Sequence, residues 1–165
     1  MMQESHSVGD TDVRTCRKSF IITGAHYGDK CFPGLNDMLY EACRHPKAYS
    51  EMKRDFEFLT VNAIRRQLRG FKAPGLITLH YTFGEPRKGN KRDYDNICAA
   101  GRKIINDALV KTETIKDDSP KYLGYGTNTF VYTDVPFILV EIEEVETPES
   151  FSYGRENGQK KPVHA

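Results

Sequence analysis

The apolar residues of the chain recur at the intervals expected for helices and strands. The clearest case lies in residues 47–69, where Met52, Phe56, Leu59 and Ala63 follow one another at spacings of four, three and four, as on one face of a helix. Similar patterns predict helices at residues 37–43 and 97–110, and strands at residues 17–24, 76–83, 122–133 and 137–145. The short link at residues 134–136 predicts that the last two strands form a hairpin. The order of the elements predicts an α+β fold, in which helices pack on a mixed β-sheet.

The two ends of the chain differ in composition from the part between them. Residues 1–14 and 147–165 are rich in Ser, Gly, Pro and charged residues, and we expect flexible tails around a single domain at residues 15–146. The chain of 165 residues is 38% hydrophobic and 28% charged, as is usual for a soluble globular protein. No apolar run approaches the roughly 20 residues that cross a bilayer, and the N-terminal residues lack the apolar stretch of a secretion signal. A cytoplasmic protein without a membrane partner is expected.

The four cysteines give no sign of a metal site. Cys16, Cys31, Cys43 and Cys98 include no C-x-x-C pair, and no histidine lies at zinc-binding spacing from them. They are interpreted as buried or idle thiols of a protein in a reducing compartment.

Charge is unevenly distributed along the chain, although the net charge is only +1. Residues 44–71 and residues 72–103 each contain seven Lys or Arg and three Asp or Glu, whereas residues 104–149 contain three basic and ten acidic residues. This asymmetry indicates a basic face for a polyanion and an acidic side that stays in solvent.

Acidic residues follow the basic loop in a pattern that suits a metal site. Asp93 and Asp95 are two residues apart, so their side chains point the same way only if this segment is extended and the helix begins at about Asp95 or Asn96. With Asp118 they would offer oxygen ligands, which favour Mg²⁺, or Mn²⁺ in its place, over zinc. The alternative is that Asp93 or Asp95 only caps the helix and that Asp117 and Asp118 begin a turn.

Several ordered motifs resemble the RusA family of Holliday junction resolvases. They are Arg92-Asp93-Tyr94-Asp95-Asn96-Ile97, Lys103, Asp107-Ala108-Leu109 and Asp117-Asp118, and Pro33-Gly34-Leu35-Asn36 with Met52-Lys53 is similar to the phage-encoded branch of that family. The resemblance covers roughly residues 20–145. It implies a homodimeric, Mg²⁺-dependent endonuclease that resolves four-way DNA junctions by paired nicks in opposed strands, in DNA recombination or repair. It also implies a phage or prophage gene expressed in a bacterial cytoplasm.

The resemblance also implies roles for individual residues. By position, Asp93, Asp95 and Asp118 match the metal-binding carboxylates of the family, and Lys103 matches its active-site lysine. On an ideal helix, however, Arg102 points closer to the direction of Asp95 than Lys103 does, so either residue is a candidate for the phosphate contact.

The spacing of the three carboxylates raises the question of whether one chain can bring them together. A helix over residues 96–110 is about 22 Å long, and residues 111–118 span at most about 28 Å. Asp118 therefore returns to Asp95 of its own chain only along a nearly straight path. We put forward the hypothesis that the partner in a dimer supplies Asp118.

Candidate DNA contacts come from the loop before the acidic residues and from the helices. They are Arg87, Lys88, Lys91, Arg92, Lys53 and Arg102. Loss of the Arg92 side chain is expected to weaken DNA binding and flatten its salt dependence. Tyr94 and Phe83 either stack at a branch point or pack in the core, and packing is favoured. The alternative functions are a non-catalytic DNA-binding dimer and a nuclease that prefers flaps or forks.

Overall fold

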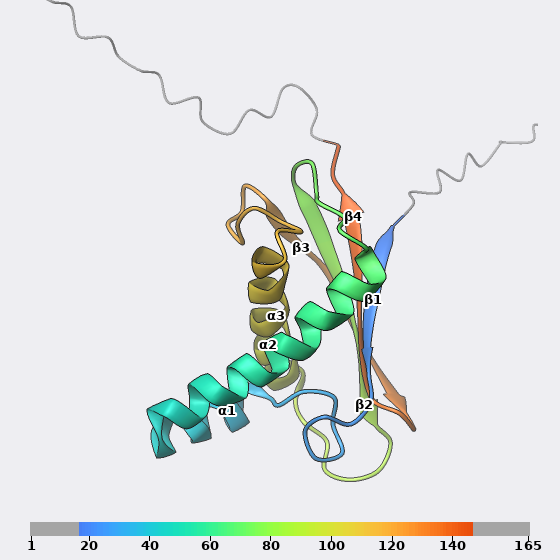
Figure 1. Cartoon of the computed structure of the whole chain (residues 1–165). Helices are drawn as coiled ribbons and strands as arrows, with labels where there is room; N and C mark the ends of the chain where they lie inside the picture. The colour runs from blue at the N-terminus through green and yellow to red at the C-terminus, as the bar shows by residue number, and fades with distance from the viewer. Residues whose placement is uncertain (1–16, 147–165) are drawn as a thin grey trace, which may run out of the picture.

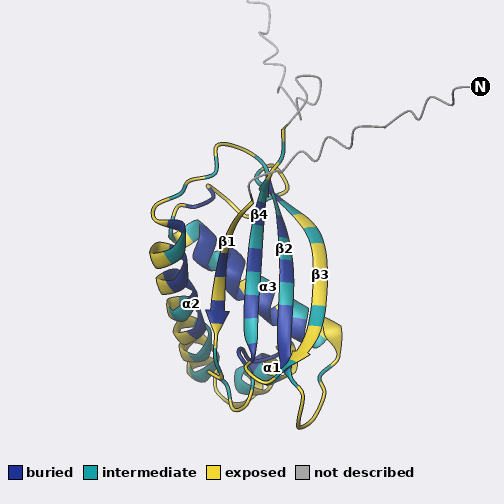
Figure 2. Cartoon of the chain, turned by 90° about the vertical axis from the view of Figure 1, so that its right-hand side faces the viewer, coloured by how far each residue is buried: buried dark blue, intermediate teal, exposed yellow. Residues whose placement is uncertain are grey.

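The computed structural model describes residues 17–146, so both predicted tails and Cys16 lie outside it. The elements are β1 (Lys18–Thr23), α1 (Leu35–Arg44), α2 (Pro46–Leu68), β2 (Ile77–Pro86), α3 (Tyr94–Lys111), β3 (Leu123–Thr133) and β4 (Phe137–Glu144). Their types and order confirm the predicted α+β fold. The helices lie on one side of the sheet (Figure 1), and the view onto the other side shows all four strands uncovered (Figure 2).

The ends of α2 follow from local chemistry. The ring Nδ1 of His45 accepts a hydrogen bond from the Lys47 backbone N–H at 3.2 Å, and Pro46 occupies the first turn, where its missing N–H is harmless. At the other end Arg69 and Gly70 both have positive φ angles, 49° and 78°, which stops the helical hydrogen-bond pattern. Both ends agree with the helix ranges predicted from the sequence, residues 37–43 and 47–69, which leave His45-Pro46 between two helices and Gly70 after the second.

The strand order of the sheet is β1-β4-β2-β3, so the sheet is mixed, as predicted. β4 pairs antiparallel with β1 and β2, whereas β3 pairs in parallel with β2. The predicted hairpin of the last two strands is therefore wrong, because β2 lies between them. The four Cα steps from Thr133 to Phe137 reach about 13 Å, enough to step over one strand, since two strand spacings are about 9.6 Å.

Burial explains why β2 and not β3 takes the inner position. Every second residue of β2 from Ile77 to Phe83 is at most 1% exposed, so this strand requires neighbours on both sides. β3 is mostly exposed and suits an edge. The core lies between the sheet and the inner faces of α2 and α3, where Ile64, Ile104 and Leu109 are at most 2% exposed.

The opposite edge of the sheet is fastened to α2. The Ile21 backbone N–H donates to Gln67 Oε1 at 2.9 Å, and Gln67 Nε2 donates to the Ile21 carbonyl at 2.8 Å. One side chain thus satisfies both outward backbone groups of that residue and fixes the C-terminal half of α2 against β1. Across residues 17–146, no helix combines the length and the apolar character needed to span a membrane.

Candidate active site

The segment that leads into α3 is held in place by Arg92. Its guanidinium forms two hydrogen bonds with the Glu85 carboxylate, at 3.1 and 2.6 Å, and donates a third to the Phe32 carbonyl at 2.9 Å. Both charged side chains are only 10% exposed, and Asp37 adds a longer contact at 3.9 Å. Arg92 therefore anchors the loop to the end of β2 and to the segment before α1. The donors of Arg92 face protein groups in this structure, so a contact with phosphate would require these bonds to break, and the DNA contact stays a prediction.

Asn96 provides a second anchor, four residues after the first. Its Oδ1 accepts a hydrogen bond from the Asn36 backbone N–H at 2.8 Å, so it satisfies a free donor at the N-terminus of α1. The approach is so close that a Cβ at Gly34 would lie 2.5–2.8 Å from the Asn96 amide. This contact gives a structural reason for the Gly34-Leu35-Asn36 motif and couples it to the acidic segment.

Asp93 and Asp95 project between these two anchors. Asp93 is the N-cap of α3, with extended backbone and its Oδ1 accepting from the Asn96 N–H at 2.8 Å, so the alternative that it caps the helix is confirmed. α3 begins at Tyr94, one or two residues earlier than predicted, and the fully extended path over residues 93–95 that would point both side chains the same way is not present. Asp95 lies in the first helical turn, where a negative charge is favoured. Both side chains are exposed, and Asp95 forms no ion pair with any residue of 17–146.

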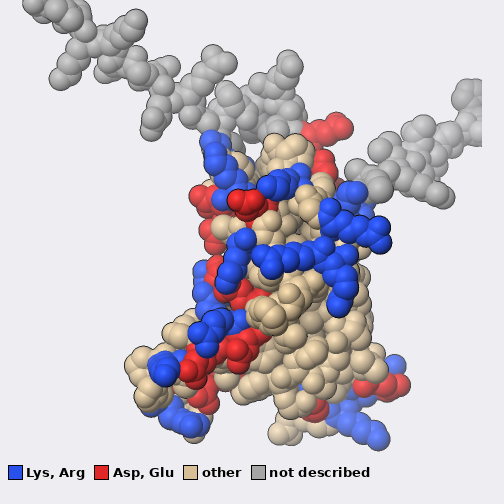
Figure 3. Space-filling view, in the orientation of Figure 1, with Lys and Arg blue, Asp and Glu red and all other residues tan. Residues whose placement is uncertain are grey.

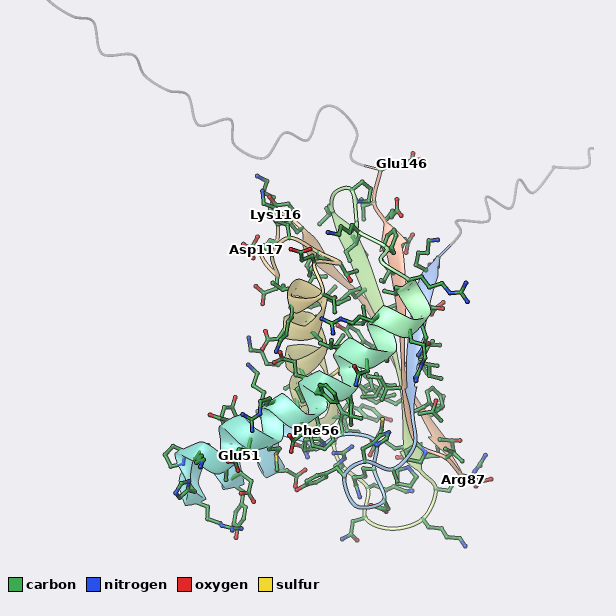
Figure 4. All side chains as sticks on the ribbon, in the orientation of Figure 1. Glu51, Phe56, Arg87, Lys116, Asp117 and Glu146 are labelled. Carbon is green, nitrogen blue, oxygen red and sulfur yellow. The ribbon has the colours of Figure 1, made fainter. Side chains whose placement is uncertain are left out.

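The segment that carries Asp118 follows the other end of α3, which ends at Lys111. From Asp95 to Lys111 the helix rises about 24 Å, and Figure 4 places Asp117 above its C-terminal end, whereas Arg87 labels the loop at the opposite end of the molecule. Asp117 Oδ1 accepts from the Ser119 N–H at 2.8 Å, so this aspartate does form a turn. Asp118 is exposed. Accordingly, no three His, Cys, Asp or Glu side chains of the described residues form a group that could hold a metal ion.

The Lys103 side chain interacts with Asp107, one turn closer to the C-terminal end of α3. It donates to Asp107 Oδ1 at 3.0 Å, and Lys53 binds Oδ2 of the same carboxylate at 2.6 Å. The hydrogen bond to Asp107 raises the pKa of Lys103, and the charge of Asp118 adds a smaller contribution. Burial raises the pKa of Asp107, but hydrogen bonds from Lys53 and Lys103 outweigh it and lower that pKa below its usual value.

The remaining residues predicted to contact DNA differ in whether their cationic groups already interact with other groups of the protein. Arg102 packs over the Tyr125 ring at 3.7 Å, so its guanidinium is partly covered by a protein partner. Lys91 donates to the carbonyls of Pro86 and Arg87 and lies over the Tyr132 ring. Arg87 pairs with Asp134 at 3.1 Å across an exposed surface, and Lys88 is exposed without an ion pair among the described residues. Of this set, Lys53, Lys91 and Arg102 are largely committed to protein partners.

Phe83 and Tyr94, the two aromatic candidates, differ in burial. Phe83 is 1% exposed and packs in the core, as favoured. Tyr94 is 59% exposed and stacks on Phe130 at 4.1 Å, which in turn stacks on Phe83. Packing was the wrong expectation for most of the Tyr94 ring, because its position at the start of α3 leaves one partner only.

Glu85 is the site residue that the sequence did not single out, because it lies near the end of an apolar strand and no local pattern indicates its ion pair. Asn36 belongs to a motif that the sequence did indicate, but its contact is made by the backbone N–H and could not be assigned from the residue type. For the chemistry of the exposed pair, Mg²⁺ is commonly held by one or two carboxylates together with water and phosphate oxygens. Asp93 has one oxygen outside its cap hydrogen bond, and the exposed carboxylate of Asp95 makes no hydrogen bond with residues 17–146, so each can contribute a ligand of this kind.

No protein-family model matches the chain, and the search of curated proteins finds no match. Function is therefore inferred from the residue types, their arrangement and the resemblance carried by the motifs.

Proposed function

We propose that this protein is a Mg²⁺-dependent endonuclease that acts as a homodimer on branched DNA and nicks opposed strands of four-way junctions. The observation that carries the proposal is the exposed carboxylate pair Asp93 and Asp95, held between the anchors Arg92 and Asn96. Carboxylates fixed on rigid backbone and left free of cations are suited to a hard metal ion. The RusA-like order of motifs supports the same activity and suggests recombination or repair in a bacterial cytoplasm.

The hydrolysis has simple chemical requirements. A water oxygen bonds to the scissile phosphorus, the bond to the leaving ester oxygen breaks, and that oxygen takes up a proton. A bound Mg²⁺ supplies activation of water and stabilises charge on the phosphate. The role of Asp93 and Asp95 is to bind and orient the ion, and Lys103, whose pKa is raised further by its hydrogen bond to Asp107, supplies positive charge.

The opposite placement of Asp95 and Asp118 along α3 favours a site shared between subunits. In that arrangement Asp118 and Lys103 come from one subunit, and Asp93 and Asp95 come from its partner. A two-fold dimer then holds two equivalent sites, which suits a four-way junction of nearly two-fold symmetry.

The first test is cleavage of a synthetic fixed four-way junction in Mg²⁺ and in EDTA. Asp95→Asn should abolish cutting while leaving junction binding largely intact, because the two side chains have the same shape and differ in charge. The matched control is Asp55→Asn, an exposed aspartate on α2, which should cut normally. Equal cutting by Asp95→Asn and the wild type would refute the proposal.

The second test concerns sharing of the site. Subunits carrying Asp93→Asn are mixed with subunits carrying Asp118→Asn, and each variant alone should be inactive. If sites are shared, the heterodimer contains one site with both native carboxylates and recovers cutting. No recovery in a confirmed heterodimer shows that each site belongs to one chain.

A non-catalytic DNA-binding dimer is the second candidate, and it is favoured because no three potential metal ligands come together within residues 17–146 of one chain. Binding that survives EDTA, with no cutting of junctions, flaps or forks in Mg²⁺ or Mn²⁺, supports it. Faster cutting of flaps or forks than of junctions supports the nuclease with a different preferred substrate.

A further inference from the structure

The structure leaves three arginines at the C-terminal end of α2, counting its C-cap residue, free of any carboxylate of residues 17–146. Arg65, Arg66 and Arg69, here called the arginine ridge, are exposed, and none forms an ion pair with a residue of 17–146. The sequence from Phe58 to Phe71 contains no Asp or Glu. Figure 3 shows Lys and Arg side chains gathered over the C-terminal half of α2. Three uncompensated guanidinium groups on one short surface produce a strong local positive potential.

The backbone beneath the arginine ridge is rigid. The inner face of the same helical segment buries Ile64 at 2% and Leu68 at 7% exposure, and Gln67 makes its two hydrogen bonds to β1. A ligand on the ridge therefore orders only the arginine side chains and no backbone. Arg65 and Arg69 are one helical turn apart, with a rise of about 6 Å between them, so they can contact neighbouring phosphates rather than compete for one.

The chemistry of the surroundings selects the kind of polyanion. The exposed positions within Asn62–Gly70 include no aromatic ring on which an unpaired base could stack, and the exposed ring of Phe58 lies about 10 Å along the helix axis from Arg65. Stacking on successive aromatic rings is a main source of affinity for single strands, so one ring at this distance favours a duplex. The same positions include no exposed apolar side chain of the kind that enters a lipid surface. Arginine forks bind phosphate oxygens in pairs, and a backbone of regularly spaced phosphates matches a row of them.

We propose that the arginine ridge is a binding surface for the phosphate backbone of double-stranded DNA, separate from the acidic pair. This inference rests on the proposed action on DNA and moves the main electrostatic contact from the loop at residues 87–92 to α2. In Figure 1 the ridge end of α2 lies near the upper end of the sheet, whereas α3 begins near the lower end. The ridge therefore holds a duplex arm at a distance from the scissile phosphate and does not take part in the chemistry.

The test compares two double variants that remove equal charge. Arg65→Gln with Arg69→Gln removes two ridge charges, and Arg44→Gln with Lys47→Gln removes two exposed charges near the other end of α2. Binding of a labelled linear duplex and of a fixed four-way junction is measured in EDTA across a range of salt concentrations. With about 0.9 counterions released per phosphate contact, the ridge variant should have a salt slope shallower by about 1.8 and bind about 30-fold more weakly at 0.15 M salt.

The control pair should change neither quantity, and Arg65→Lys with Arg69→Lys should retain most of the slope because it retains the charge. Equal losses in the ridge and control variants, or none in either, overturn the inference. If the glutamine pair loses its helical circular dichroism, each single variant is measured instead and should reduce the slope by about 0.9. Ridge-dependent binding to vesicles of anionic lipid, without binding to duplex, also overturns it.

The same data separate this inference from the proposed nuclease. Ridge-dependent binding without cutting in Mg²⁺ upholds the ridge and refutes the nuclease. Cutting with unchanged binding by the ridge variant refutes the ridge alone. Failure of the wild type to bind any DNA refutes both.

Discussion

Replacement of Arg92 by alanine should destabilise the fold rather than remove a phosphate contact. The variant leaves the Glu85 carboxylate, with a side chain only 10% exposed, without its bidentate partner, and it frees the Phe32 carbonyl from a hydrogen bond. Breaking a buried ion pair by removing one partner costs about 3–5 kcal/mol. For a domain of this size, that loss corresponds to a fall in Tm of about 10–20 °C.

The measurement is urea and thermal unfolding at neutral pH, followed by circular dichroism. Arg87→Ala is the matched control, because Arg87 belongs to the same loop but pairs with the 90% exposed Asp134, and surface pairs of this kind contribute about 0–1 kcal/mol. The double variant Arg92→Met with Glu85→Leu should recover much of the loss, since it removes both charges together. An Arg92→Ala protein as stable as the wild type, with a shallower salt slope for DNA binding, would refute this reasoning and restore the phosphate role.

Three further predictions follow from individual side chains. The pKa of Asp107 is lowered in the folded state, so its ionised form contributes stability above the unfolded pKa of about 3.9, and this stability is lost as pH falls through the folded value. The difference in unfolding free energy between the wild type and Asp107→Asn should therefore be constant near neutral pH and shrink on acidification below about pH 4. A difference that grows on acidification would contradict this prediction. Burial raises the pKa of the Cys31 thiol to about 12. In the native protein Cys31 should therefore react with a thiol reagent far more slowly than the exposed Cys43, and mass spectrometry of labelled peptides measures both rates. Equal rates for the two cysteines would contradict the burial of Cys31. Gly34→Ala should disturb the contact with Asn96 and lower Tm, whereas Gly75→Ala, where a Cβ meets nothing within 4 Å, should not; equal shifts in the two variants would argue against that contact.

The acidic site was predictable in its residues but not in its assembly. A D-x-D-N string beside basic residues indicates carboxylates at a helix start, and Asp93 and Asp95 are exposed there. The sequence could not show that Arg92 is neutralised by Glu85, because an ion pair forms only when a strand ending and a loop are brought together. It also left open how far Asp118 lies from Asp95, and the path of the chain after α3 separates them within one subunit.

The amino-acid sequence by itself determined where helices and strands lie, because the alternation of apolar and polar residues along a segment reports the face that it buries. Local chemistry likewise determined the break at His45-Pro46 and the end of α2 near Gly70. Only the tertiary structure decided the strand order, since a link of three residues can close a hairpin or step over a neighbouring strand equally well. It also decided which cations are free, because charge compensation depends on side chains that are distant in sequence and adjacent in space.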